Sequence, residues 1–425
     1  SSPVRGRRSL ATMVEKVVIV GGGFAGLNAA MQLNRANVEV TLIDRTNHHL
    51  FQPLLYQVAT GGLSPADIAS PIRYILRRQD NVAVIEDTVT GIEADAVVTT
   101  TRRIPFDHLI VATGATHHYF GNDEWETTAP GLKTLPDATQ LRAMILEAFE
   151  EAERTGNADL TFLVVGGGPT GVEMAGAIVE MANHTLRRDF RTIDPGAARV
   201  LLVEAGDRIL STYPHTLSLK AEAQLEELGA EVRTGWEVTD LDRGTATLSS
   251  GEETEQLTTA ATVWAAGVKA SPLGAALVPL GAELDRAGRV RVNPDLSIPG
   301  HPNIYIAGDL AALEQGGSPV PGVAPAAIQM GRYVADRIRG KNTRDFRYRN
   351  KGSLATIGRS AGIADFGRIR FSGLPAWAAW LGVHIFFLIG FQNRLLVMIQ
   401  WAWSYMTRNR SARLIVRYED DERLP

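Results

Sequence analysis

The 425-residue sequence contains no cysteine. This absence excludes structural disulfides, thiolate metal sites and any mechanism that passes electrons through a protein dithiol. The sequence also has little net charge, −4 at pH 7, and lacks a long basic stripe. Both features argue against a general nucleic-acid partner. We therefore predict no metal site and no nucleic-acid binding.

The N-terminal segment lacks an apolar core of signal-peptide length. It reads "SSPVRGRRSLAT", which is basic and rich in serine. We expect residues 1–12 to be a flexible leader outside the fold, with a targeting segment as the alternative. The sequence as a whole, 45% hydrophobic and 21% charged, is typical of a folded globular protein with two or three domains.

One internal repeat stands out. "VVIVGGGFAGLNAA" (residues 17–30) and "FLVVGGGPTGVEMA" (residues 162–175) each have a short apolar run, a Gly-rich turn and an Ala-rich stretch. The apolar runs are continuous, as strands buried on both faces of a parallel sheet require. The repeat predicts two dinucleotide-binding folds in one chain.

The first copy has the glycine spacing of a dinucleotide-binding turn. Gly21, Gly23 and Gly26 follow a predicted strand and begin a predicted helix, and Asp44 ends the next strand. The first glycine permits the tight turn, the second lets a pyrophosphate approach, and the third lets helix and strand pack. We expect Asp44 to accept hydrogen bonds from an adenosine ribose.

The second copy consists of Gly166, Gly168 and Gly171, with Glu204 ending the next strand. The gap before Glu204 is longer than usual, and a predicted helix over residues 172–190, followed by a loop, accounts for it. A carboxylate at this place accepts a ribose hydroxyl and repels a 2′-phosphate, so we expect NADH to be preferred over NADPH. Arg208, four residues further on, keeps NADPH open as an alternative.

A third element, "HPNIYIAGDLAAL", is a strand that ends at Gly308 and Asp309. A helix follows shortly, with Pro325 in its first turn. Its positive end would face whatever lies over Asp309 and would stabilise an anionic reduced flavin there. Taken alone, this motif indicates only the end of a strand.

The C-terminal segment is unusually apolar. Residues 374–391 carry no charged side chain, residues 395–406 add a second apolar stretch, and "GFQNR" interrupts them. Four of the seven tryptophans and three arginines fall in or beside these stretches: Trp377, Trp380, Trp401, Trp403, Arg394, Arg408 and Arg410. This pattern favours helices that lie in a membrane interface over residues 374–410. A buried dimer core and a membrane span are the alternatives.

These patterns predict an α/β fold with two Rossmann-like dinucleotide-binding domains, the second inserted in the first, and a C-terminal amphipathic-helix membrane-docking module. The expected boundaries are 13–155 and 281–345 for the first dinucleotide-binding domain, 156–280 for the second, and 346–425 for the membrane-docking and dimerisation module; the family resemblance given next implies that the first domain binds FAD and the second binds NADH.

The sequence resembles the two-dinucleotide-binding flavoproteins and, among them, the type II NADH dehydrogenases, which are single-subunit NADH:quinone oxidoreductases. The resemblance spans residues 13–410 and is greatest to actinobacterial members. Its motifs are "HHLFQPLLYQVATGGLSP", "GGGPTGVEMAG", "WAAGV", "GVAPAAIQMG", "NKGSLATIGR" and "GFQNR".

The resemblance implies noncovalent FAD, NADH as the substrate, and a membrane quinone, menaquinone or ubiquinone, as the acceptor. It further implies a peripheral, monotopic enzyme on the cytoplasmic face of the plasma membrane that does not pump protons and forms a homodimer. The implied FAD-binding residues are Gly21, Gly23, Phe24, Ala25, Gly26, Asp44, Arg45, Gln52, Pro53, Leu54, Thr113, Gly114, Gly308, Asp309, Ala326 and Ala327. The implied NADH-binding residues are Gly166, Gly168, Pro169, Thr170, Gly171, Glu204, Ala266 and Gly267.

The resemblance also implies catalytic roles for Glu173, Gln329 and Lys351, near the nicotinamide, the flavin and the quinone. The plainer alternatives are a first-turn carboxylate at Glu173, favoured by the helix dipole, and a glutamine at the edge of the core at Gln329. Pro325 replaces a glutamine that the family usually carries, which leaves Gln329 as the remaining amide. The proton donor to the quinone stays open among Glu173, His48, His49 and water.

Other activities occur on the same fold. Disulfide reductases and sulfide:quinone oxidoreductases need redox cysteines, which this chain lacks. An FAD- and NADH-dependent reductase of a small redox protein remains an alternative, although it has no use for a Trp-rich tail. A membrane-docked, NADH-sensing flavoprotein without turnover is the non-enzyme alternative.

Overall fold

The computed structural model describes residues 14–157, 159–388, 391–407, 410 and 412–415. The expected leader and Arg408 lie outside the described residues. By compactness the chain divides into two units. Unit 1 takes the chain up to His49 together with Pro71–Ala115 and Ala270–Asn350; unit 2 takes Leu50–Ser70, Thr116–Lys269 and the chain from Lys351 onward. This division into compact units does not test the predicted boundaries of the cofactor-binding domains, which stay a prediction.

Unit 1 is built on a six-stranded sheet in the order β20-β21-β9-β1-β2-β5. All neighbours are parallel except β20 with β21. Val17 to Val20 of β1 are almost fully buried, as a central strand covered on both faces requires. The strands are β1 (Glu15–Val20), β2 (Val38–Asp44), β5 (Val82–Glu86), β9 (His108–Val111), β20 (Ser297–Ile298) and β21 (His301–Ile306).

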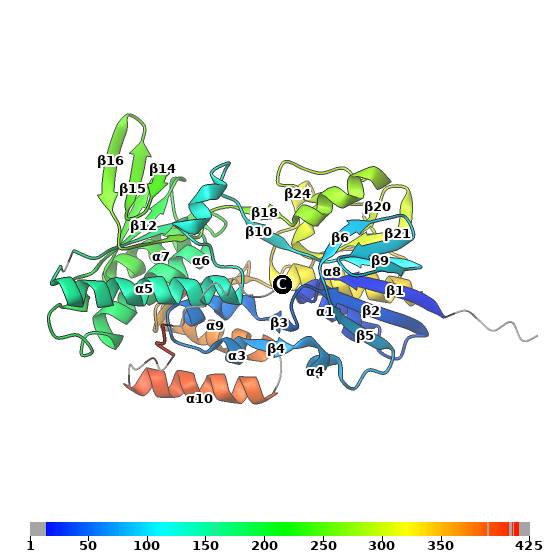
Figure 1. Ribbon diagram of the computed structural model, residues 1–425, viewed down its shortest axis with the longest axis horizontal. Helices are drawn as coiled ribbons and strands as arrows, with labels where there is room; N and C mark the ends of the chain where they lie inside the picture. Colours follow the sequence, from blue (N-terminus) through cyan, green and yellow to red (C-terminus); the bar gives the residue numbers. More distant parts are fainter. Residues whose placement is uncertain (1–13, 158, 389–390, 408–409, 411, 416–425) are drawn as a thin grey trace, which may run out of the picture. The chain divides into compact units, whose positions relative to one another are not determined.

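Two helices pack together beside this sheet, α1 (Phe24–Gln32) and α8 (Ala324–Ile338) (Figure 1). Gly331 makes their close approach possible, because a Cβ there would lie 2.1 Å from the carbonyl oxygen of Ala25. The remaining elements are α4 (Ile72–Leu76), a small antiparallel sheet of β6 (Val89–Ile92), β7 (Ala96–Thr99) and β8 (Arg103–Pro105), η5 (Pro272–Leu280), η6 (Gly308–Leu310), and the pairs β19 (Val290–Arg291) with β22 (Ala311–Ala312) and β23 (Glu314–Gln315) with β24 (Ser318–Pro319).

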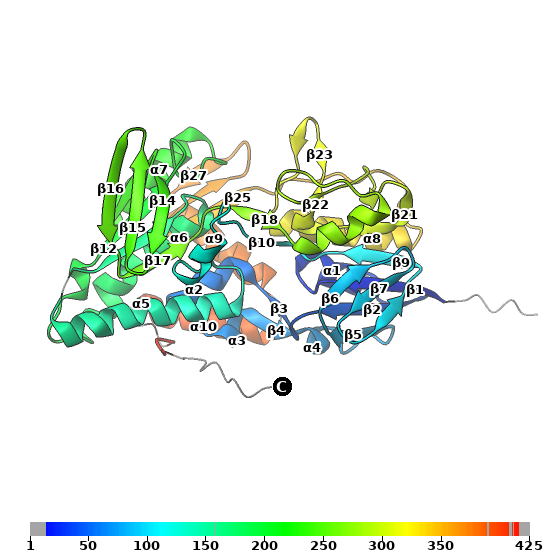
Figure 2. The ribbon, with the colours of Figure 1, turned by 45° about the horizontal axis from the view of Figure 1, so that its top comes forward.

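Unit 2 contains a second parallel sheet in the order β13-β12-β11-β17. Its strands are β11 (Thr161–Val165), β12 (Arg199–Glu204), β13 (Ala230–Thr234) and β17 (Ala261–Trp264). An antiparallel sheet of β14 (Glu237–Asp242), β15 (Thr245–Ser250) and β16 (Glu253–Thr258) lies beside it (Figure 2). Both sheets contribute to one apolar cluster that includes Trp264 and Leu248. The accompanying helices are α5 (Leu135–Thr155), α6 (Pro169–Glu180) and α7 (His215–Leu228).

Helix α6 is shorter than the sequence predicts. It ends at Glu180 and passes into a π-helical turn, Met181–Thr185, before an irregular segment. The carboxylate of Glu153 accepts hydrogen bonds from the backbone N–H groups of Arg191, Thr192 and Ile193. These bonds hold that segment in a non-helical conformation, which the apolar periodicity alone does not predict.

The C-terminal part of unit 2 begins with a three-stranded sheet, β25 (Ser353–Ile357), β26 (Ala361–Asp365) and β27 (Arg370–Ser372). Helix α9 (Leu374–Phe387) covers this sheet through buried Ala376 and Trp380. Helix α10 (Phe391–Thr407) follows and contacts α9. Near them are η1 (Gln52–Leu54), α2 (Leu55–Ala59) and α3 (Pro65–Ile68).

The chain passes between the units five times. Four of the passages fall within short strands, β3 (His48–Leu50), β4 (Ala69–Pro71), β10 (Ala115–His117) and β18 (Val268–Ala270), and the fifth lies between Asn350 and Lys351. The predicted fold class, two dinucleotide-type α/β units with a C-terminal module, is confirmed.

Candidate functional site

The first glycine turn has three glycines with different surroundings. Gly21 adopts a φ of 103°, which a residue with a side chain rarely tolerates. A Cβ on Gly26 would lie 1.9 Å from the carbonyl oxygen of Gly21, so this position permits the close packing of α1 on β1. A Cβ on Gly23 would meet no described atom within 4 Å. The open space at Gly23, at the N-terminus of α1, is where a phosphate can approach.

Asp44 at the end of β2 is fixed by this turn. One carboxylate oxygen accepts the N–H of Gly22 at 2.6 Å, and the other accepts the N–H of Thr46 at 2.7 Å and its hydroxyl at 2.8 Å. A carboxylate offers about four acceptor sites, so an acceptor position remains for a ribose hydroxyl.

The second glycine turn repeats this geometry in unit 2. Gly166 has a φ of 107°, and a Cβ on Gly171 would lie 1.8 Å from the carbonyl oxygen of Gly166. Gly168 is open, as Gly23 is. Glu204 accepts the N–H of Gly167 at 2.6 Å and the N–H of Gly206 at 2.7 Å. The two turns are therefore built alike, down to the hydrogen bonds of the acidic residue.

The surroundings of the first turn fit a dinucleotide. Thr113 follows β9, and its backbone nitrogen would lie 3.2 Å from a Cβ on Gly21. The Thr113 hydroxyl is buried and has no hydrogen-bond partner among the described residues. A buried polar group of this kind normally finds a partner, and a bound ligand would supply one.

Asp309 lies near the start of α8, since its side chain is 3.4 Å from the position that a Cβ on Gly322 would take. Gly308 has a φ of 79°, and Pro325 occupies the first turn of α8 as predicted. Ala326 and Ala327 are buried in the same helix.

The structure also places three other predicted site residues, Gln329, Gln52 and Lys351. Both ends of the Gln329 amide bind the backbone of Arg349, its nitrogen donating to the carbonyl and its oxygen accepting the N–H, each at 3.0 Å. Gln52 donates to the carbonyl oxygen of Lys133 at 3.1 Å, and Lys351 is exposed. The amide of Gln329 therefore already has hydrogen-bond partners at both its nitrogen and its oxygen within the protein.

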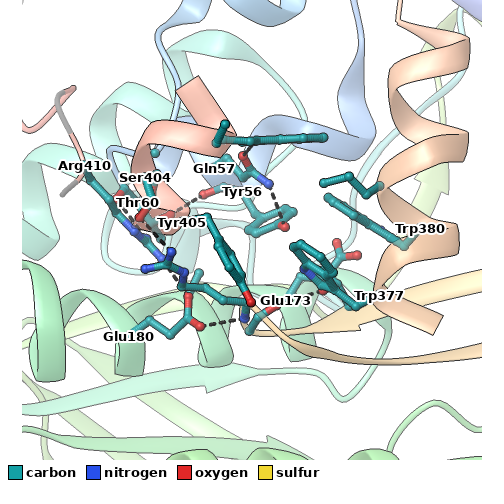
Figure 3. A pocket seen from close by; sticks show the side chains of 18 of the residues that line it. Tyr56, Gln57, Thr60, Glu173, Glu180, Trp377, Trp380, Ser404, Tyr405 and Arg410 are labelled. Carbon is teal, nitrogen blue, oxygen red and sulfur yellow. Dashed lines mark hydrogen bonds and ion pairs between the residues drawn. The ribbon is translucent and has the colours of Figure 1, made fainter. Parts of the chain in front are cut away.

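Unit 2 contains a cavity of about 450 Å³, here called the tail pocket. It is lined by residues of α2, α6, β25, α9 and α10. Its walls are largely apolar and aromatic, with Trp377, Trp380 and Leu381 from α9 and Met398 and Trp401 from α10 (Figure 3). The pocket is thereby formed jointly by the second nucleotide-type domain and the apolar C-terminal helices.

Glu173 of α6 lies in the wall of the tail pocket. Part of the Glu173 side chain is exposed to the pocket, but the carboxyl group has protein atoms on most sides. Burial raises the pKa of Glu173 to about 8, and interactions with the Thr356 backbone and the Trp380 indole lower it by less. The carboxyl group is therefore mostly protonated at pH 7 and can donate a proton.

A second polar group in the pocket wall was missed by the sequence analysis. Glu180 forms a buried ion pair with Arg410 at 3.1 Å and accepts the backbone N–H of Arg359 at 2.6 Å. Arg410 also donates to the carbonyl oxygen of Thr60 at 3.1 Å. Figure 3 shows Glu180 and Arg410 pointing toward each other. Glu180 follows Glu173 by two helical turns, and this spacing was the available signal.

Helix α10 directs several hydrogen-bonding side chains, together with buried Val397, toward the protein and a row of large apolar side chains outward. On the inner face Asn393 donates to Ser70 at 3.2 Å and Trp401 to Gln57 at 2.7 Å. The outer face of α10 is defined as Leu395, Leu396, Ile399, Trp403 and Met406, with exposed fractions of 43, 41, 56, 63 and 81%. Within the described part of the chain, the helices are too short or too polar to cross a bilayer.

Comparison with known proteins agrees with these features. The family described as pyridine nucleotide-disulphide oxidoreductase matches residues 15–331, and the NDH2 C-terminal domain matches residues 350–409. The chain is 48% identical to the type II NADH:quinone oxidoreductase Ndh of Mycobacterium tuberculosis, over 93% of this chain and 89% of that protein. It is 28% identical to the type II NADH:quinone oxidoreductase of Staphylococcus aureus, over 82% and 89%.

Among solved structures, NDH2 from Plasmodium falciparum in complex with NADH has a TM-score of 0.86 at 20% identity, covering 95% of this chain and 100% of that one. The match shows the common fold. By its fold and its two glycine turns, the chain belongs to the pyridine nucleotide-disulphide oxidoreductase family. Within that family it is a type II NADH:quinone oxidoreductase homologue, as the resemblance predicted.

Proposed function

We propose that this chain oxidises NADH with the help of FAD and delivers two electrons to a membrane quinone without pumping protons. The observation that carries this proposal is the tail pocket, in which a mostly protonated carboxyl group and the apolar C-terminal helices line one cavity. Reducing a quinone to a quinol requires two electrons and two protons. A small redox protein as the acceptor would need no such pocket.

The glycine turns divide the nucleotides between the units. Gly21, Gly23, Gly26 and Asp44 would hold FAD in unit 1, and Gly166, Gly168, Gly171 and Glu204 would hold NADH in unit 2. FAD, when bound, supplies a group that accepts a hydride from NADH and passes on electrons in pairs. Glu204 would accept a ribose hydroxyl and repel a 2′-phosphate, which supports the preference for NADH over NADPH.

The tail pocket is the proposed quinone site. Its tryptophans offer flat apolar surfaces to a quinone ring and its isoprenoid tail, and its volume lies within the range of small-molecule sites. Gln57 donates to Tyr56 and accepts from Trp401, so these three groups form one network in the wall. Glu173 is the proposed proton donor to the quinone.

The outer face of α10 is the proposed membrane contact. Its outer face is apolar although it is exposed, whereas a helix on the surface of a water-soluble protein turns polar side chains outward. An exposed apolar patch of this kind marks a lipid or protein contact. We propose a monotopic enzyme on the cytoplasmic face of the plasma membrane, which forms a homodimer and takes menaquinone or ubiquinone from the lipid.

The test is steady-state NADH oxidation by the purified holoenzyme with ubiquinone-1, menadione and ferricyanide as acceptors. NADH should bleach the yellow protein, and each quinone should restore the colour. Replacing Leu381 in the pocket wall with tryptophan should block the quinones while ferricyanide reduction persists. Bleaching that no quinone reverses would contradict the proposal and favour a protein acceptor or an NADH sensor.

A further inference from the structure

His49 is buried beside the first glycine turn in unit 1. The residue is 2% exposed, its Nδ1 lies 2.9 Å from the carbonyl oxygen of Gly22, and its ring meets that of Phe24 edge-on with centroids 5.2 Å apart. A carbonyl oxygen can only accept, so Nδ1 must carry the proton. Burial lowers the pKa of His49, so the ring is neutral near pH 7. Its other nitrogen, Nε2, therefore presents a lone pair.

The Nε2 atom of His49 has no hydrogen-bond partner among the residues that the structure describes. Asp44 is the nearby carboxylate, and a carboxylate cannot donate. Both Asp44 oxygens already accept hydrogen bonds from Gly22 and Thr46. A buried acceptor without a donor is unfavourable, so the donor must come from outside the described chain.

We infer that Nε2 of His49 accepts a hydrogen bond from a hydroxyl group of bound FAD and so positions the cofactor on the first glycine turn. The inference rests on the proposed binding of FAD by unit 1. The pyrophosphate of FAD carries no proton at neutral pH and cannot pair with a lone pair. The hydroxyls of the ribityl chain and of the adenosine ribose are donors, and they flank the pyrophosphate on either side.

A second atom at the same turn supports this reading. The buried hydroxyl of Thr113, whose backbone nitrogen lies close to Gly21, also has no partner among the described residues. Two residues beside one glycine turn, Thr113 just after β9 and His49 on β3, thus each have a buried polar atom without a partner among the described residues. The sequence analysis placed Thr113 among the FAD-binding residues and considered His49 only as a proton donor.

Two substitutions separate the two nitrogens of His49. In His49→Asn the amide nitrogen lies near the place of Nδ1, so it can still donate to Gly22 while the acceptor is lost. In His49→Gln the amide oxygen reaches the place of Nε2, so the acceptor is kept. The readout is the Kd of FAD for the apoprotein, measured by quenching of flavin fluorescence. We expect His49→Asn to weaken binding roughly tenfold or more and His49→Gln to stay within about threefold. Unchanged affinity in His49→Asn overturns the inference.

FAD analogues that each lack one hydroxyl identify the donor. The wild-type protein should bind one analogue more weakly than FAD, and His49→Asn should not distinguish that analogue from FAD. A missing ribityl hydroxyl with this effect assigns the ribityl chain, and a missing ribose hydroxyl assigns the adenosine. If wild type and His49→Asn discriminate equally against every analogue, His49 contacts no hydroxyl.

The experiment is independent of turnover, because FAD binding is measured before NADH or quinone is added. If both variants fail to fold, the wild-type protein still decides: equal affinity for FAD and every analogue overturns the inference. A wild-type enzyme that binds FAD tightly but reduces no quinone would contradict the proposed function and leave the role of His49 intact.

Discussion

At the scale of single residues, Gly26 is needed for the close packing of the first turn, whereas Gly23 leaves space open for a ligand. We predict that Gly26→Ala lowers the free energy of unfolding by about 3 kcal/mol or more, because its Cβ would lie 1.9 Å from a backbone oxygen. Gly23→Ala is the matched control, since its Cβ meets no described atom. It should unfold near the wild-type temperature yet bind FAD more weakly. Thermal unfolding and FAD titration check both, and equal stability of the two variants would contradict the prediction.

The ionisation of Glu173 predicts a pH dependence. Its pKa is raised to about 8, so the neutral acid is present below that pH and is lost above it. We expect quinone reduction to fall on the alkaline side with a midpoint near pH 8, whereas ferricyanide reduction, which needs no proton, should not follow this curve. Glu173→Gln should reduce quinone turnover roughly tenfold or more, and exposed Glu226→Gln is the control. An unchanged alkaline limb in Glu173→Gln would remove Glu173 as the donor.

The same shift affects stability with a definite sign. Between the ordinary pKa of 4.5 and about 8, the folded protein holds a proton at Glu173 that the unfolded chain releases. Stability therefore decreases as pH rises through this window. Glu173→Gln should flatten the decrease, as seen in unfolding midpoints measured in denaturant at pH 5 and pH 8.

The residues that could be predicted best from the sequence are those that act through backbone conformation or backbone contacts within one motif. The strain at Gly21 and the tight contact at Gly26 follow from the motif, because spacing along the chain alone brings these atoms together. Glu180 and Arg410 were not paired in advance, since their contact joins residues far apart in sequence. The lone pair of His49 required the hydrogen bond to Gly22 to be known.

At the scale of elements, α6 and the segment after α10 are joined by the buried pair of Glu180 and Arg410. Breaking such a pair leaves a charge without its partner, so we predict that Arg410→Met costs about 3 kcal/mol of stability. The double variant Glu180→Gln with Arg410→Met should recover part of that loss. A double-mutant cycle by chemical denaturation measures the coupling, and strictly additive losses would contradict it.

The predicted strand ends are confirmed where the apolar pattern is continuous, because β2 ends at Asp44 and β12 ends at Glu204. In contrast, most of "GFQNR", which interrupts the apolar stretches of the tail, lies inside a helix, because α10 begins at Phe391. The π-helical turn after α6 was not foreseen, because Glu153 from another helix fixes the following segment. Composition indicated that the tail was apolar. The direction in which α10 turns its apolar side depended on its polar partners Ser70 and Gln57.

At the scale of the whole molecule, the proposed membrane contact can be separated from folding. We predict that Trp403→Ser with Met406→Ser reduces binding to liposomes at least tenfold, since each large apolar side chain contributes about 1.5–3 kcal/mol when buried. Leu219→Ser is the control, because Leu219 is also exposed, at 51%, but lies on α7. Flotation with anionic vesicles measures the bound fraction. Equal flotation of the variant and wild type would argue for a protein partner on this face.

The two largest sheets, one in each unit, were predictable from the repeat, because each copy carries its own strand, turn and helix. The assignment of residues 50–70 to the second compact unit was not, since these residues follow β2 of the first nucleotide-type domain and lie within its expected range, 13–155. Their contacts with α6 and α10 depend on tertiary structure.

The apolar outer face of α10 has a practical consequence. Hydrogen-bonding side chains of α10 contact the protein itself, while tryptophan and methionine side chains are exposed to solvent. We therefore expect the protein to stay dispersed only when another molecule covers these exposed side chains. In buffer without detergent, we expect the molecules to aggregate through these faces and to lose activity with time. Mild detergent, or short-chain phospholipid above its critical micelle concentration, should restore particles of a single size.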